Sequence, residues 1–186
     1  MLRRFSSNTR PHIANWIGGK NVEPASNAFM PNINPATTEV INHVPLSNAT
    51  DVDNAVKAAR SSLQCWSETR SSERSATLRQ IADLLDARKE DFAYAESIDT
   101  GKPLNLARAL DISRSAHNFR FFADALDEFA AKKETYVQNS PQRAVHHVMH
   151  RPVGVAGLIS PWNLPLYLLS WKVLCSPIYF VRCNIF

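Results

Sequence analysis

The sequence predicts an α/β protein in which small β elements and three helices lead into the first strand of an incomplete, Rossmann-like parallel sheet. Short runs of strand-forming residues come first, and three long segments with apolar residues every 3.6 positions follow them. A continuously apolar stretch, residues 153–159, comes next and is typical of strands that are buried on both faces in parallel sheets. The 186 residues are enough for one domain with its own core.

The first elements are two short extended pairs. "NWIGGKNV" predicts two strands joined by the turn Gly18-Gly19, because glycine pairs between short apolar runs are a hairpin signal. "NINPATTEVINHVPL" predicts a second extended pair around residues 35–38. Neither pair is long enough to form a core alone.

Three helices are expected after the hairpins. The first begins at Val52, with Thr50 and Asp51 in the positions of a cap and a first-turn acid. The second begins near Ser72 and ends at Gly101, a typical terminating residue. The third runs over about residues 104–132. Each has one apolar face, formed in the third by Leu106, Leu110, Ala116, Phe119, Ala123 and Leu126.

The last part of the chain, "RAVHHVMHRPVGVAGLIS", predicts a strand, a break at Pro152 and the buried strand 153–159. We expect barely any helix after the following turn. We therefore also expect strand 153–159 to have no partner strand within the chain, since a parallel βαβ unit needs a crossover and a second strand.

Composition excludes several classes of function. The net charge is +4, but the 21 basic residues are spread through the helical segments, and no basic stripe interleaved with aromatic residues indicates a nucleic-acid partner. No apolar run approaches the roughly 20 residues that span a bilayer. The chain has only three cysteines, Cys65, Cys175 and Cys183. A small and odd number of cysteines indicates no disulfide framework and a reducing compartment.

The first ten residues contain three arginines and two serines among them and no acid. This composition fits either a disordered basic terminus or a short organelle-import leader. We therefore expect a cytoplasmic protein, with mitochondrial import as the alternative.

The segment "SPWNLP" holds the strongest candidate for chemistry. Pro161 and Pro165 fix their own φ angles and hold the preceding residues extended, so Asn163 lies on a stiff turn at the carboxyl end of a buried strand. A side-chain amide held in this way can stabilise an oxyanion without adding a full charge. The alternative is an ordinary turn asparagine that hydrogen-bonds its own backbone.

Several segments in order resemble the aldehyde dehydrogenase superfamily: "NWIGGK", "NINPATTEVI", "DVDNAVKAAR", "RSSERSATLRQIADLL", "SIDTGKP", "NFRFFADAL" and "RPVGVAGLISPWNLPLYLLSWK". The P-W-N-x-P element is highly specific, whereas the others are individually weak and jointly strong. The resemblance covers about residues 13–172. It divides the chain into a basic leader or terminus (1–12), a partial cofactor-binding domain (13–172) and a divergent tail (173–186).

The resemblance implies roles for the residues of the turn and the segment after it. Asn163 matches the family's oxyanion-hole asparagine, and Lys172 a lysine with a suggested proton-relay role. A nicotinamide cofactor, NAD or NADP, is expected to lie along Ile159, Ser160, Pro161 and Trp162. The wall of the aldehyde tunnel is expected from Leu164, Tyr167, Leu168 and Trp171, whose spacing places them on one helical face. Without the family, plain core packing is the alternative for that face.

Arg120 is a second candidate. "NFRFF" looks most like the branch that oxidises aminomuconic and hydroxymuconic semialdehydes, where an arginine of this helix is thought to hold the substrate carboxylate. The alternative is a partly exposed arginine paired with Asp124 one turn on. His146 and His150 share a strand face, but no acid or cysteine joins them in sequence, so no metal site is expected.

The family's nucleophilic cysteine, general-base glutamate and Gly-rich nucleotide turn are not found after Lys172. The sequence therefore resembles a fragment of a dehydrogenase, and we expect no dehydrogenase activity from this chain alone. The alternatives are a non-catalytic isoform that joins full-length subunits through the "AVHHVMH" strand edge, a gene-model artefact, or a mostly unfolded product.

Overall fold

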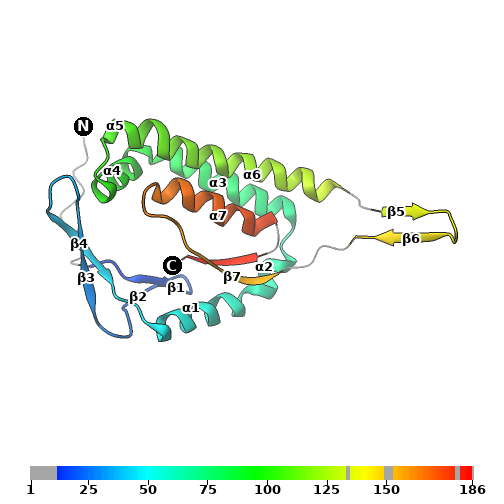
Figure 1. Ribbon diagram of the computed structural model, residues 1–186, viewed down its shortest axis with the longest axis horizontal. Coiled ribbons are helices and arrows are strands. Elements are labelled where there is room, and N and C mark those ends of the chain that lie inside the picture. Colours follow the sequence, from blue (N-terminus) through cyan, green and yellow to red (C-terminus); the bar gives the residue numbers. More distant parts are fainter. Residues whose placement is uncertain (1–11, 133–134, 149–152, 179–180, 186) are drawn as a thin grey trace.

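The computed structural model describes residues 12–132, 135–148, 153–178 and 181–185 (Figure 1). It is a mixed α/β arrangement, as predicted, in which the described strands form four two-stranded sheets. The import leader predicted for residues 1–10 lies outside the described residues, as does His150. None of the described helices is long and apolar enough to cross a membrane.

Both N-terminal hairpins form as predicted. β1 (Asn15–Ile17) pairs antiparallel with β2 (Lys20–Val22) around Gly18-Gly19, whose φ angles of 60° and 80° favour glycine. β3 (Phe29–Ile33) pairs antiparallel with β4 (Val40–Pro45). These strands are at most six residues long and lie at one end of the molecule (Figure 1).

The first helix, α1 (Ala49–Ser61), is capped by Asn48 and not by Thr50 as predicted. The Asn48 side chain accepts a hydrogen bond from the Thr50 backbone N–H, and the Asp51 carboxylate accepts one from the Asn48 backbone N–H at 2.9 Å. This is a capping box, which needs the acid three residues after the cap, so Asp51 places the cap at Asn48. A short helix, α2 (Leu63–Glu68), follows after Ser62.

The second predicted helix is two helices, α3 (Ser71–Ala87) and α4 (Lys89–Thr100). Arg88 leaves helical geometry, with φ −111° and ψ 24°. The break lets α3 pack along α6 while α4 packs against a different segment, η1. A single straight helix of this length would contact only one of them, and apolar periodicity alone does not reveal such a bend. Gly101 ends α4 in the left-handed conformation, as predicted.

The third predicted helix is confirmed in extent but is not uniform. It consists of α5 (Leu104–Leu106), a π-helical turn η1 (Ala107–Ile112) and α6 (Ser113–Ala131). The wide turn η1 packs on α4, and Ala107 and Ile112 are completely buried there. π-helical turns are frequent at functional sites.

A separate hairpin extends from the body of the molecule (Figure 1). β5 (Thr135–Gln138) pairs antiparallel with β6 (Ala144–His147), and all of these residues except Ala144 are exposed. Exposed large side chains include Tyr136, Val137 and Val145.

The strand predicted over 153–159 forms as β7 (Gly154–Leu158), but the expectation that it has no partner is wrong. α7 (Pro165–Ile178) is a 14-residue helix, and β8 (Val181–Ile185) returns to pair parallel with β7. A crossover helix of this length supplies the reach that a parallel pair needs. A larger Rossmann-like sheet is not seen, since β7 has one strand neighbour among the described residues.

The core lies where α3, α6 and α7 meet. It is built from Leu78, Ala82, Leu85, Ala116, Phe119, Ala123 and Leu174. Alanines at the contact let α3 and α6 approach closely along their length. The strand pair β7–β8 lies between this helical layer and α1 (Figure 1). The turn from β7 into α7 lies beside the C-terminal end of α4, because Lys102, which follows α4, contacts Asn163.

Candidate functional site

The turn of residues 159–164 joins β7 to α7 and contains the predicted oxyanion asparagine. Asn163 is exposed, and its side-chain amide has no hydrogen-bond partner among the described residues. The alternative of a turn asparagine that bonds its own backbone is therefore not what this turn shows. The amide is available to a ligand while the backbone that carries it is held.

Three hydrogen bonds within the segment hold this backbone. The Lys172 ammonium donates to the Ile159 carbonyl, and the Ser160 hydroxyl lies 3.4 Å from the Pro165 carbonyl oxygen, to which it donates. The Leu168 N–H donates to the Leu164 carbonyl at 2.9 Å, in the first turn of α7. Lys172 thus folds back over the turn, which places it beside the segment predicted for the cofactor.

A buried ion cluster lies beneath the turn, and sequence reasoning missed it. The Lys102 ammonium is 2.6 Å from an Asp111 carboxylate oxygen, 3.5 Å from Glu96 and 3.4 Å from the Asn163 carbonyl oxygen. The three side chains are only 12%, 1% and 6% exposed for Lys102, Asp111 and Glu96. The signal was present in "DTGKP", where the sequence indicated only a helix end at Gly101.

Glu96 contacts the backbone just after the turn, in the first turn of α7. Its carboxylate accepts a hydrogen bond from the backbone N–H of Leu166, one of the unpaired donors in the first turn of α7. Burial raises the pKa of Glu96 above its ordinary value, and Lys102 partly opposes that shift. Asp111 keeps one carboxylate oxygen without a partner among the described residues.

The predicted tunnel wall comprises Leu164, Tyr167, Leu168 and Trp171. The Tyr167 and Trp171 rings are 6.3 Å apart, and Trp171 also stacks edge-on against Phe122 of α6 at 5.7 Å. Leu164 and Leu168 are half-buried. The structure therefore brings Tyr167 and Trp171 to the α6–α7 contact and leaves part of each of the four side chains accessible.

Arg120 lies on the other side of α6 and faces α3. Its guanidinium pairs with Asp83 at 2.7 Å and with Asp86 at 2.8 Å, so its partner is not Asp124, which instead pairs with Arg79. These carboxylates raise the pKa of Arg120 further. The guanidinium of Arg120, which the sequence suggested as the partner of a substrate carboxylate, is therefore already paired with two carboxylates of the chain.

Arg114 is a candidate that the sequence did not suggest. It precedes Arg120 by six residues on α6 and so projects from a different face of the helix. Its guanidinium carbon lies 5.6 Å from the centre of the Tyr167 ring, and no carboxylate pairs with it among the described residues.

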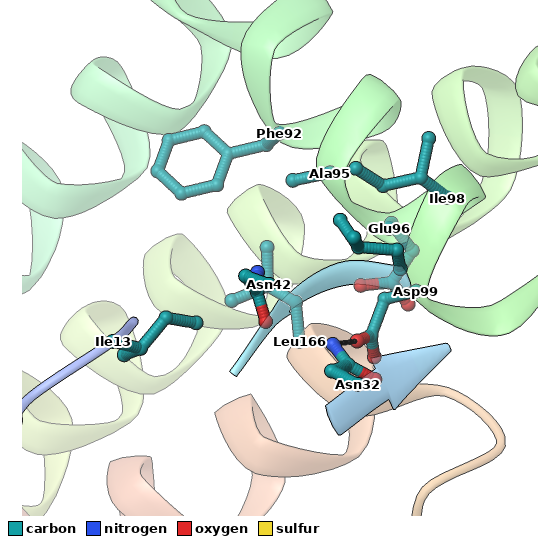
Figure 2. Close-up of a pocket in the computed structure, with 10 residues that line it drawn as sticks. Ile13, Asn32, Asn42, Phe92, Ala95, Glu96, Ile98, Asp99 and Leu166 are labelled. Atoms are coloured by element: carbon teal, nitrogen blue, oxygen red, sulfur yellow. Dashed lines mark hydrogen bonds between the residues drawn. The ribbon is translucent and has the colours of Figure 1, made fainter. Parts of the chain in front are cut away.

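A cavity of about 280 Å³ lies between α4 and the β3–β4 sheet (Figure 2). Phe92, Ala95 and Ile98 give it an apolar side, while Glu96 and Leu166 connect it to the ion cluster and to α7. The Asn32 side-chain amide donates to Asp99 at 2.8 Å across its rim (Figure 2). The cavity thus adjoins the turn from below and does not contain Asn163.

The described residues hold no group of three histidines, cysteines or acids placed to bind a metal ion. His146 instead lies within hydrogen-bonding distance of Gln138, and His147 of Thr135, inside the exposed hairpin. Cys65 is exposed on α2.

Comparison with known proteins identifies the family of the chain. A model of the aldehyde dehydrogenase family matches residues 22–178. The chain belongs to the aldehyde dehydrogenase family. Within that family it is 47% identical over 161 residues to human 2-aminomuconic semialdehyde dehydrogenase and 42% identical over 162 residues to 2-hydroxymuconic semialdehyde dehydrogenase of Pseudomonas sp. strain CF600. Each match covers 87% of this chain and only 32–33% of the relative, so the chain spans about a third of these dehydrogenases.

Solved aldehyde dehydrogenases share the fold of this third. The NAD+ complex of the Bacillus cereus enzyme superimposes with a TM-score of 0.84 and 32% identity, over 94% of this chain and 35% of that enzyme. Indole-3-acetaldehyde dehydrogenase of P. syringae, in complex with NAD+ and IAA, superimposes with a TM-score of 0.86 and 28% identity, over 96% and 36%. These structural relatives are aldehyde dehydrogenases bound to NAD+.

Proposed function

We propose that this chain is the part of an NAD(P)-dependent aldehyde dehydrogenase that supplies the oxyanion donor and one side of the cofactor and aldehyde sites. The observation that carries the proposal is Asn163: an exposed, unpartnered side-chain amide on a proline-bracketed turn whose backbone is held by Lys102. An amide that is already fixed in place stabilises a developing oxyanion without reorganising during the reaction.

The segment 159–162 fits a nicotinamide cofactor. Ile159 and Trp162 are 78% and 85% exposed, so the segment presents a broad apolar surface. The bound cofactor supplies the hydride acceptor of aldehyde oxidation. In this proposal Lys172, folded onto the Ile159 carbonyl, lies close enough to the same surface to take part in proton movement.

The substrate class in this proposal is an aldehyde that carries a carboxylate, like the semialdehydes named for the two muconic relatives. Arg120 was the sequence candidate for that carboxylate, and it would first have to release Asp83 and Asp86. Arg114 is the better-placed guanidinium, because it has no carboxylate to release and lies against Tyr167 of the proposed tunnel wall. A planar guanidinium suits two-point binding of a carboxylate.

The purified 186-residue chain is expected to form no NADH from NAD and an aldehyde. Thiohemiacetal chemistry needs a thiolate beside the oxyanion donor, and Cys65 lies exposed on α2. Absorbance at the NADH band, with a complete dehydrogenase as the positive control, measures this. Turnover by the purified chain would contradict the division of labour proposed here.

A chimera tests the role of Asn163 directly. The 161-residue segment of human 2-aminomuconic semialdehyde dehydrogenase that matches this chain is replaced by the chain's own residues. We expect the chimera to oxidise a semialdehyde and Asn163→Ala to lower its kcat by roughly 10²- to 10³-fold, as loss of an oxyanion donor does. Asn105→Ala is the control, since Asn105 is exposed and its side-chain oxygen accepts from Arg108, away from the turn. Equal kcat in both variants would reject the proposal.

The second candidate function is association without catalysis. The β5–β6 hairpin is exposed, and an unpaired strand edge is a template for another chain. In this candidate the chain binds complete dehydrogenase subunits through the hairpin. Co-purification with a tagged complete subunit tests it, with Val145→Lys, which places a charge on the edge strand, as the disrupting variant. Equal recovery of both forms would exclude the hairpin as the contact.

A further inference from the structure

The ion cluster of Glu96, Lys102 and Asp111 is more completely buried than any other ion pair described in the chain. Buried charge pairs are expensive to form, because their desolvation offsets most of the attraction between them. Stability alone is therefore a weak reason for this cluster. What distinguishes it is the pair of backbone groups that it contacts.

Those two backbone groups flank Leu164 and Pro165, where the turn enters α7. Lys102 donates to the Asn163 carbonyl oxygen at 3.4 Å, just before Leu164-Pro165. Glu96 accepts from the Leu166 N–H, just after them. Asp111, from the π-helical turn η1, holds the Lys102 ammonium at 2.6 Å and so aims it. Pro165 has no N–H, which leaves Leu166 as the first donor that α7 can offer.

We propose that Glu96, Lys102 and Asp111 are positioning residues that clamp the backbone at Asn163 and Leu166, where the turn enters α7, and thereby orient the Asn163 side-chain amide. The clamp consists of one cation on a carbonyl and one carboxylate on an N–H, joined by their own ion pair. The functional meaning of the clamp rests on the proposed oxyanion role of Asn163. Its effect on the backbone of the turn does not depend on that role.

The geometry explains three features that otherwise have no common cause. The wide turn η1 brings Asp111 to the cluster, with its backbone carbonyl accepting from Ser115. Gly101 ends α4 in the left-handed conformation, and Lys102 follows it and reaches back to Glu96 of α4. Gly101 itself lies against Pro35 and Ala36, where a larger side chain would collide. Glu96 lies between the cavity of Figure 2 and the start of α7. Each device brings one member of the clamp to the turn.

Amide hydrogen exchange on the 186-residue chain, measured residue by residue by NMR, tests the clamp without any turnover. The test variant is Glu96→Gln, which keeps the size of the side chain and weakens its bond to Leu166. A second is the double variant Lys102→Met with Asp111→Asn, which removes the cation together with the carboxylate nearest to it and leaves Glu96 with its bond to the Leu166 N–H. The control is Arg108→Met, which breaks the exposed pair with Glu90.

We expect exchange at Leu166, whose N–H is bonded to Glu96, and at Leu168, whose N–H is bonded to the Leu164 carbonyl, to accelerate by about tenfold or more in the double variant, and by less in Glu96→Gln. Exchange in α3, for example at Leu78, should change little, because the clamp does not contact that helix. A purely structural role would accelerate both regions together, and that result would overturn the proposal. Unchanged exchange at the turn in both variants would overturn it as well.

Failure of the clamp and failure of the oxyanion role have different signatures. If the turn amides respond as expected but Asn163→Ala leaves the chimera's kcat unchanged, the clamp stands and the oxyanion role falls. If Asn163→Ala lowers kcat but the turn amides do not respond, the oxyanion role stands and the clamp falls.

Discussion

At the scale of single residues, burial and partners separate side chains that the sequence treats alike. Arg114 and Arg120 are both arginines of α6, six residues apart. Arg120 is held by two carboxylates of α3, whereas Arg114 lies against an aromatic ring and is free of carboxylates among the described residues. The same helix therefore offers one structural guanidinium and one that is available to a ligand.

A matched pair of variants in the chimera tests this difference. Arg114→Met should raise KM about tenfold for an aldehyde that carries a carboxylate and leave KM unchanged for a neutral aldehyde. Arg120→Met should leave both KM values unchanged, because its guanidinium serves Asp83 and Asp86. Steady-state kinetics with the two substrates measure the split. The reverse pattern would assign the carboxylate to Arg120, as the sequence suggested.

The raised pKa of Glu96 makes stability depend on pH in a defined direction. The folded chain binds this proton more tightly than the unfolded chain, so the contribution of Glu96 is fully present below its ordinary pKa of 4.5. It is lost as the pH rises through the folded-state pKa. Relative to Glu96→Gln, the wild-type chain should therefore lose unfolding free energy between pH 4.5 and neutrality. Urea midpoints at several pH values measure this, and a flat difference would contradict it.

At the scale of elements, the contact between α3 and α6 depends on small residues. Ala82 and Ala123 are completely buried at this contact. Interiors are packed closely enough that an added isobutyl group must displace its neighbours. The apolar stripe in the sequence identified the faces of both helices but not how closely they approach.

Ala123→Leu should lower the free energy of unfolding by about 1–3 kcal/mol through overpacking. Ala130→Leu, on an exposed position of the same helix, is the matched control and should change it by less than about 0.5 kcal/mol. Urea denaturation followed by circular dichroism compares the two. Similar effects of both substitutions would show that the contact tolerates more volume than the structure indicates.

At the scale of the whole molecule, the pairing of β7 with β8 changes the expectation for folding. A strand without a neighbour indicated a mostly unfolded product, but the described chain has a parallel strand pair and a core shared by three helices. Both α1 and α7 also contact β8, so the last strand joins elements that are distant in sequence.

We therefore expect the purified chain to unfold in one cooperative transition. Far-UV circular dichroism follows the helices, and tryptophan fluorescence reports on Trp171 at the contact of α6 and α7. Coincident urea curves from the two probes would support a two-state transition. Trp162→Phe removes an 85% exposed reporter without touching the core and serves as the control. A gradual, non-coincident change would instead support the unfolded alternative.

The sequence by itself determined the family, the order of the elements and the stiff turn that carries Asn163. These follow from local chemistry: apolar periodicity, glycine and proline at chain reversals, and a specific five-residue element. The break at Arg88, the partner of β7, the partners of Arg120 and the cluster beneath Asn163 were decided only by tertiary structure. Each depends on contacts between residues distant in sequence, and Lys102 reaches Asn163 across 61 positions. Local patterns do not encode which distant groups share a buried space.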